Sequence, residues 1–252
     1  MQVQSRGFTI DYRCNQGRGP CFLLVHGMLQ AGEDWVAYGY PEELSPYRII
    51  AVDQLGFGQS DKPHDATAYG LDNQVADLVA VLDAEDIDRA VIWGYSMGCY
   101  AAEALARQKP ERTTGLVLGG NLVGLSPQDR SNIVTGAAAE LAEKGVAAYC
   151  EDNLPFLDPR TRQLFVKRND PIAAGLADEA HASPHAGEGA ALPEIVLNYA
   201  GSNEPWFEVA VAVAEVHKVT FRAIDGADHA QAFRGSRTVV RATRDYLGAV
   251  LN

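Results

Sequence analysis

Gly94-Tyr95-Ser96-Met97-Gly98 follows the short apolar run 90–93 and precedes a segment with the periodicity of a helix. A sharp strand-to-helix turn strains its central residue, and small residues two positions before and after let the backbone pass. The Ser96 hydroxyl would then stand at the carboxyl edge of a sheet, near free amides that favour a developing oxyanion. The pentapeptide alone could form an ordinary turn; the strand and helix around it predict a nucleophile.

Short apolar runs bounded by turn residues recur along the chain and alternate with helical segments. Runs that are apolar on both faces are typical of central strands in a parallel sheet with helices on both sides. The expected strands are 21–25, 47–52, 90–93, 115–118, 194–199 and 219–224, and the clearest helices are 71–84, 98–108, 205–216 and 236–251. Polar and apolar residues alternate over 3–12, and this pattern predicts an antiparallel hairpin at the sheet edge. The fold class is α/β, with a doubly wound, mostly parallel central sheet.

The regular recurrence of short apolar strands stops over residues 122–192, where helical stretches are broken by prolines and glycines. A structureless loop of that length would be unusual in a compact domain. We therefore expect a small helical cap at 122–192, inserted into a core formed by 1–121 and 193–252. The apolar residues expected to shape this lid include Tyr149, Leu154, Phe156 and Leu157.

A serine hydroxyl is a poor nucleophile without a base, and six histidines compete for that role. His229 lies between the last expected strand and the final helix, and loops after parallel strands meet at one edge of the sheet. His26 directly follows the strand 21–25 and suits a structural role beside the neighbouring loops. The other four histidines are less suitable because they lie in polar stretches or at the end of a helix: His64, His181, His185 and His217. We expect His229 to be the base.

The base needs an acid to fix its tautomer and stabilise the imidazolium. Glu204 follows the strand 194–199 at the same sheet edge. Asp225 and Asp228 are rivals, but they are so close in sequence to His229 that their carboxylates would reach Nδ1 with difficulty. We expect Glu204 to be the acid; its alternative role is a carboxylate at the start of a helix.

Two backbone amides are expected to bind the oxyanion, one from Met28 in the loop after the first parallel strand and one from Met97 after the nucleophile. Leu29, Tyr95 and Trp206 are candidates for the substrate-binding wall. Leu29 could instead be a core residue, and Trp206 could instead pack against the helix that follows it.

Together these residues resemble the α/β-hydrolase fold superfamily over nearly the whole chain. Residues 53–60, DQLGFGQS, match the DxxGxGxS turn that many members carry. The order Ser96, Glu204, His229 is the superfamily's order of nucleophile, acid and base. The elbow and small cap are most similar to single-domain esterases, enol-lactonases and cofactor-free haloperoxidase-like members. Two features depart from that branch: a glutamate where aspartate is more common, and the bulky Tyr95 beside the nucleophile.

The resemblance implies a serine hydrolase that cleaves a small, largely apolar ester or lactone through an acyl-enzyme intermediate, without metal or cofactor. Epoxide hydrolases and haloalkane dehalogenases of this superfamily use an aspartate nucleophile, which differs from Ser96. Two alternatives stay open. One is a C–C bond hydrolase or lyase with the same triad, and the other is a slow-turnover ligand receptor of the same fold.

Composition argues against several other classes of protein. The 252 residues carry 21 Lys plus Arg and 33 Asp plus Glu, a net charge of −12, which disfavours binding to nucleic acid or anionic membranes. The amino terminus lacks a signal-peptide pattern, and no run approaches the roughly 20 apolar residues of a membrane helix. We expect a cytoplasmic monomer or homodimer with a small-molecule substrate. The scattered cysteines predict neither disulfides nor a metal site: Cys14, Cys21, Cys99 and Cys150.

Overall fold

The centre of the computed structural model is a single mixed sheet. The structure describes residues 1–133, 136–155 and 157–251. The strands in this part of the chain are β1 (Gln2–Ser5), β2 (Phe8–Cys14), β3 (Cys21–Val25), β4 (Arg48–Val52), β5 (Ala90–Tyr95), β6 (Thr113–Gly119), β7 (Val196–Gly201) and β8 (Thr220–Ile224). Their spatial order is β1-β2-β4-β3-β5-β6-β7-β8. The strands from β4 to β8 in this order run parallel, and β1 and β2 add antiparallel pairs at one edge.

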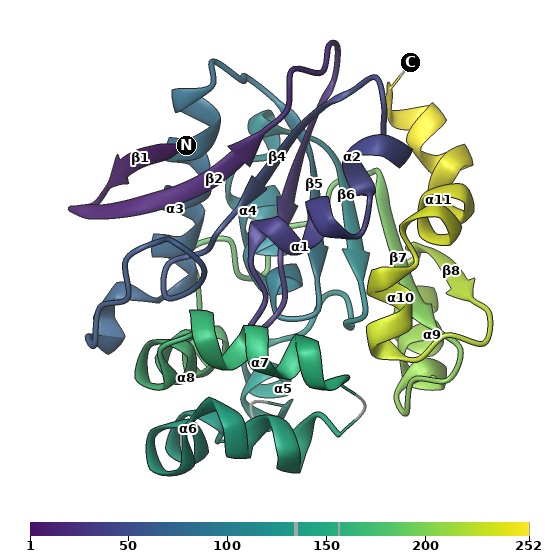
Figure 1. Ribbon diagram of the computed structural model, residues 1–252. Helices are drawn as coiled ribbons and strands as arrows, with labels where there is room; N and C mark the ends of the chain where they lie inside the picture. The colour runs from purple at the N-terminus through teal and green to yellow at the C-terminus, as the bar shows by residue number, and fades with distance from the viewer. Residues whose placement is uncertain (134–135, 156, 252) are drawn as a thin grey trace.

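Helices cover both faces of the sheet, and a further group of helices at one edge, which we call the cap helices, lies where the cap was expected (Figure 1). The core helices are α1 (Gly32–Ala37), α2 (Tyr40–Glu43), α3 (Leu71–Ala84), α4 (Gly98–Gln108), α9 (Phe207–Val216), α10 (His229–Arg234) and α11 (Ser236–Leu251). The cap helices are α5 (Pro127–Ile133), α6 (Ala137–Asn153), α7 (Pro159–Arg168) and α8 (Pro171–Glu179). Short 3-10 turns are η1 (Ala66–Ala68), η2 (Pro110–Arg112) and η3 (Ala180–Ala182). In Figure 1 the green cap helices lie at the edge to which the arrows of β5 and β6 point.

The α/β fold class expected from the sequence is confirmed, and α3, α4 and α11 have the predicted bounds. Differences occur at element ends. The helix expected from residue 205 begins at Phe207, and Trp206 is the residue before its first turn. Residues 3–12 form most of the β1–β2 hairpin. Phe156, expected in the cap, lies outside the described residues.

Two apolar layers hold the sheet between its helices. Alternate side chains of β5 enter opposite layers, so that Ile92 packs on the face of α3 and α4 while Trp93 packs on the face of α1, α2 and α11. Both side chains are fully buried. Burying a large apolar side chain contributes about 1.5–3 kcal/mol, so the sheet is a firm support for the loops at its edge. Within the described ranges, no helix has both the length and the apolar character needed to cross a membrane.

The turn between β5 and α4 packs closely against β3. An ideal Cβ on Gly98 would lie 2.3 Å from the carbonyl oxygen of Val25 and 2.5 Å from that of His26. An ideal Cβ on Gly94 would lie 2.7 Å from the Cα of Cys99. Only glycine fits at either position, so α4 begins directly against the carboxyl end of β3.

Gly98→Ala is expected to lower the free energy of unfolding by about 1–3 kcal/mol, the usual cost of overpacking, because the added methyl group overlaps two carbonyl oxygens. Urea denaturation measures this change. Gly70→Ala is the control, since no atom other than those of its chain neighbours lies within 4 Å of an ideal Cβ there. Gly70 is the N-cap of α3, where alanine is less favourable than glycine, so we expect a loss of at most about 1 kcal/mol. Equal stability of the two variants would contradict the close packing at Gly98.

Candidate active site

Ser96 occupies the turn between β5 and α4 with a left-handed backbone, φ +51°. Such a conformation costs about 1–3 kcal/mol for a residue with a side chain and persists only where neighbours hold it. Two hydrogen bonds do so: the Ser96 amide donates to the carbonyl of Gly119 at 2.7 Å, and Nδ2 of Asn121 donates to the carbonyl of Ser96 at 2.9 Å. The strained turn is therefore fixed from β6 and the loop after it.

Two other segments at the same sheet edge bring partners to Ser96: His229 is the first residue of α10, and Glu204 lies in the loop after β7. The Nε2 atom of His229 lies 3.1 Å from Oγ of Ser96, and its Nδ1 atom lies 2.8 Å from Oε2 of Glu204. Oε1 of Glu204 accepts a 2.8 Å hydrogen bond from the amide of Gly201, and the carboxylate is fully buried. The structure thus links the three residues expected from the sequence, Ser96, His229 and Glu204, by consecutive hydrogen bonds.

Asp228, the rival acid nearest to His229 in sequence, has another contact. Its carboxylate accepts the amide of Gln231 at 2.8 Å, and the Gln231 side chain accepts the amide of Asp228 at 2.9 Å. This reciprocal pair caps the amino end of α10 and fixes the backbone at His229. The hydroxyl of Tyr95 donates to the carbonyl of His229, and burial raises the pKa of Tyr95 well above its usual value, so the phenol remains a donor.

A buried histidine orients the loop after β3. His26 is fully buried; its Nε2 accepts the amide of Gln54 at 3.1 Å, and its Nδ1 lies 2.7 Å from the carbonyl of Gly27. Because Nε2 accepts, Nδ1 carries the proton and donates. Burial lowers the pKa of His26, consistent with this neutral form. The peptide group is planar, so holding the Gly27 carbonyl also fixes the direction of the Met28 amide.

The amides of Met28 and Met97 have no hydrogen-bond acceptor among residues 1–133, 136–155 and 157–251. Met97 lies at the start of α4, where the helix dipole favours negative charge. The Met28 loop comes close to the nucleophile, since an ideal Cβ on Gly27 would lie 3.1 Å from Cβ of Ser96. Two unpaired donors beside a serine hydroxyl form a suitable environment for an oxyanion.

Cys99, the second residue of α4, is a second potential nucleophile near this edge. It is fully buried, and its Sγ donates to the carbonyl of Gly119 at 3.3 Å. Burial raises the pKa of the Cys99 thiol well above its usual value. It therefore stays protonated at neutral pH and does not compete with Ser96.

A cavity of about 110 Å³ opens onto Ser96 and His229. Its wall combines core and cap residues and is mostly apolar, with aromatic and aliphatic side chains from Tyr38, Tyr95, Tyr149, Leu154, Leu157, Phe165 and Phe233. Its polar members, besides the Ser96 and His229 side chains, are Gln30, Asp34, Thr161 and Arg234. This volume is small beside the roughly 300–1,000 Å³ of pockets that hold drug-sized ligands.

A wider depression of about 1000 Å³ lies elsewhere, bordered by Leu125, Pro193 and Lys218. Ser96, His229 and Glu204 are not among its described lining residues. Size alone does not identify an active site, whereas the small cavity contains a hydrogen-bonded nucleophile and base. The small cavity is therefore the candidate site.

The three residues expected to line the substrate wall have different positions. Tyr95 lines the cavity, whereas Leu29 and Trp206 are not among its described wall residues. Leu29 is a fully buried core residue with φ +60°. Trp206 is about one-third exposed, and its ring lies edge-on to His229 at 5.4 Å between centroids. Trp206 thus contacts the candidate base and does not form the wall.

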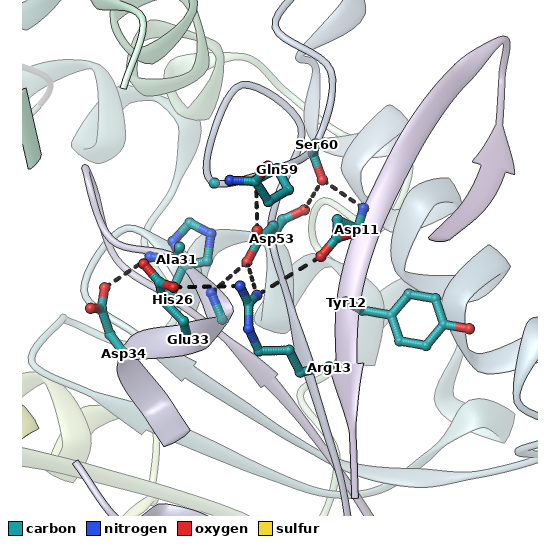
Figure 2. A network of polar contacts seen from close by, with 12 residues as sticks. Asp11, Tyr12, Arg13, His26, Ala31, Glu33, Asp34, Asp53, Gln59 and Ser60 are labelled. Atoms are coloured by element: carbon teal, nitrogen blue, oxygen red, sulfur yellow. Dashed lines mark hydrogen bonds and ion pairs between the residues drawn. The ribbon is translucent and has the colours of Figure 1, made fainter. Parts of the chain in front are cut away.

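The DxxGxGxS turn supports the scaffold around the site. The buried carboxylate of Asp53 accepts hydrogen bonds from Arg13 at 2.9 Å, the amide of Gly32 at 2.7 Å and the amide of Gln59 at 2.7 Å, as Figure 2 shows for Arg13 and Gln59. Ser60 donates to the carbonyl of Asp53 at 2.5 Å. These contacts join β2, β4 and the start of α1, which follows the loop that carries Met28.

Sequence reasoning missed two cap residues beside this loop. Arg168 and Asn169 both donate to the carbonyl of Leu29 across about 140 positions of sequence. No short motif signals a contact of such separation. A basic and an amide residue within the helical stretches of 122–192 resemble ordinary surface residues until these stretches are placed on the core.

Curated relatives and solved structures resemble parts or all of this chain. The 2-hydroxymuconate semialdehyde hydrolase of Pseudomonas sp. strain CF600 is 39% identical over 109 residues, 42% of this chain and 38% of that protein. Epoxide hydrolase B of Mycobacterium tuberculosis is 32% identical over 100 residues, 40% of this chain and 28% of that protein. The chain thus covers less than half the length of these relatives.

An esterase structure from Thermogutta terrifontis covers 100% of this chain and 99% of its own, with a TM-score of 0.82 and 22% identity. At that identity the likeness establishes the shared fold alone. A family model described as alpha/beta hydrolase fold matches residues 20–245, which include the elbow and the loops of Glu204 and His229. The chain belongs to the alpha/beta hydrolase fold family.

Proposed function

We propose that this chain is a serine hydrolase that cleaves a small, largely apolar ester or lactone through an acyl-enzyme intermediate. One observation carries the proposal: the row of Ser96 Oγ, His229 and Glu204, with donor–acceptor distances of 3.1 Å and 2.8 Å. A hydroxyl, an imidazole and a buried carboxylate in this order supply a nucleophile, a base and an orienting anion.

The reaction follows from the positions of these groups. His229 takes the proton of Ser96 as Oγ attacks the carbonyl carbon, and the amides of Met28 and Met97 stabilise the oxyanion. His229 then gives the proton to the leaving oxygen, leaving an acyl group on Ser96. A water molecule, deprotonated by His229, releases the acid. Glu204 stabilises the imidazolium in both halves without taking the proton.

The cavity supports the choice of substrate class. A volume of about 110 Å³ with mostly apolar walls accommodates a short acyl chain or a small lactone ring. His229 is partly exposed, with 23% of its side chain accessible, so water can reach the acyl group for the second step. The proposed substrate is accordingly small and uncharged near the scissile bond.

Ser96→Ala is expected to lower kcat for p-nitrophenyl esters by about 10⁴-fold or more, because the acyl-accepting oxygen is lost. Turnover of an acetate-to-decanoate series on the native protein should be highest for short chains. Release of p-nitrophenolate gives the rates, and circular dichroism checks the fold. Undiminished turnover in the variant would refute the acyl-enzyme mechanism. Tight binding of these esters by the native protein with negligible turnover would instead favour a ligand receptor.

Glu204→Gln is expected to lower kcat by about 10²- to 10⁴-fold with the fold retained, because the amide no longer stabilises the imidazolium of His229. Asp228→Asn is the matched control: it removes a carboxylate one residue from His229, while asparagine is an equally good helix cap. The control should keep activity within about threefold. Loss of activity in Asp228→Asn alone would assign the acid to Asp228.

A C–C bond hydrolase is the second candidate. Two relatives carry such names, 2-hydroxymuconate semialdehyde hydrolase and 2-hydroxy-6-oxo-2,4-heptadienoate hydrolase, at 39% and 38% identity over the matched segments. Arg234 in the cavity wall supplies a positive charge for a carboxylate, and its contacts to Thr161 and Asp158 are long, at 3.4 Å each.

This candidate predicts that the protein consumes 2-hydroxy-6-oxo-2,4-heptadienoate, seen as loss of its absorbance, with kcat/KM above that for p-nitrophenyl acetate. Arg234→Gln should then raise KM for the anionic dienoate about 10-fold or more, because the loss of a charged hydrogen bond removes over 1 kcal/mol of binding. KM for the neutral ester should change little. A preference for the ester in the native protein would exclude this candidate.

A further inference from the structure

Two residues of the cap hold the loop that carries one proposed oxyanion donor. At the end of α7, Arg168 donates from Nε and Nη2 to the carbonyl of Leu29, at 3.2 Å and 3.1 Å. Nδ2 of Asn169 donates to the same oxygen at 2.8 Å. Only 6% of the Arg168 side chain is exposed. A buried guanidinium and a buried amide thus converge on one backbone carbonyl.

The same guanidinium is paired on its other side with the start of α1. It forms hydrogen bonds with both carboxylate oxygens of Asp34, one of them at 3.1 Å, and with Glu33 at 3.0 Å. The Asp34 carboxylate also accepts the amide of Ala31 at 3.0 Å, a contact that Figure 2 draws. Asp34 lines the cavity, so Arg168 connects the cap, the loop after β3 and the cavity wall.

The held carbonyl belongs to a strained residue next to Met28. Leu29 has φ +60°, which is unfavourable for a branched aliphatic side chain by about 1–2 kcal/mol. Strain of this kind relaxes unless hydrogen bonds oppose it. On the core side, His26 fixes the peptide between Gly27 and Met28. On the far side of Met28, the described contacts of the Leu29 carbonyl come from the cap alone.

We propose that Arg168 and Asn169 are positioning residues that keep the Met28 amide directed at the oxyanion, so that the cap completes the oxyanion hole as well as covering the cavity. This inference rests on the proposed serine hydrolase function. It differs from a simple anchoring role, in which the two residues only attach the cap and affect substrate binding.

The test compares Arg168→Lys, Arg168→Met and Asn169→Ala with the native protein. Lysine keeps the charge opposite Asp34 but replaces the guanidinium fork by a single ammonium, so it cannot reproduce both sets of contacts. Alanine at 169 removes the Nδ2 contacts with Leu29 and Phe165. Lys167→Gln is the matched control, because Lys167 is an exposed cation in the same last turn of α7.

The measurements are kcat and KM for p-nitrophenyl acetate, Ki for phenylboronic acid, and Tm. A boronic acid forms a tetrahedral adduct with a serine and so needs the oxyanion donors, whereas the small acetate ester has few cap contacts. We expect kcat to fall about 10- to 100-fold in Arg168→Lys and Asn169→Ala, the boronic acid Ki to rise by a similar factor, and KM to change less than about threefold. The fall in kcat and the rise in the boronic acid Ki should be larger in Arg168→Met than in Arg168→Lys.

The opposite pattern would overturn the inference. If the Arg168 and Asn169 variants kept the kcat and the boronic acid Ki of the native protein, and only KM rose or Tm fell, the two residues would merely anchor the cap. Boronic acid affinity decides the question even if the native protein turns over no ester. A native protein with neither Ser96-dependent turnover nor boronic acid binding would overturn the hydrolase proposal together with this inference. Lys167→Gln should match the native protein in every measurement.

Discussion

The close contact between Gly98 and the end of β3 is the constraint on which the site depends. It places the first turn of α4 against the carbonyls of Val25 and His26. The residue before that helix is Met97, and the loop that leaves β3 carries Met28, so one backbone contact sets the distance between both proposed oxyanion donors. The strained φ of Ser96 is a consequence, because the chain must reverse direction within two residues.

The buried pair of Arg168 and Asp34 is hard to explain by stability alone. Removing two charges from water is costly, and apolar side chains of similar volume often serve a protein equally well or better. An apolar side chain would cover the cavity, but it could not donate to the carbonyl of Leu29. A guanidinium donates in several fixed directions at once, which suits a junction between a cap, a loop and a helix.

Sequence reasoning named Ser96, Glu204 and His229 as candidates because each follows a recognisable parallel strand, and such loops meet at one edge. The same reasoning predicted α3, α4 and α11, whose periodicity and end signals are local. It named Leu29 and Trp206 as candidates for the substrate wall from adjacency alone and left a packing role open for each, because adjacency does not give the direction of a side chain. The contacts of Arg168 and Asn169 join parts of the chain about 140 residues apart, and they depend on how the cap packs.

The choice of glutamate as the candidate acid also has a geometric reason. Asp228, beside His229, is used to cap α10, so the partner for Nδ1 comes from the loop after β7. One carboxylate oxygen of Glu204 contacts Nδ1 of His229, and the other accepts a hydrogen bond from the amide of Gly201, three residues earlier. The longer side chain permits both bonds while its own backbone amide donates to the Gly201 carbonyl. The carboxylate is therefore fixed by its own loop, and the imidazole by the carboxylate and the helix cap together.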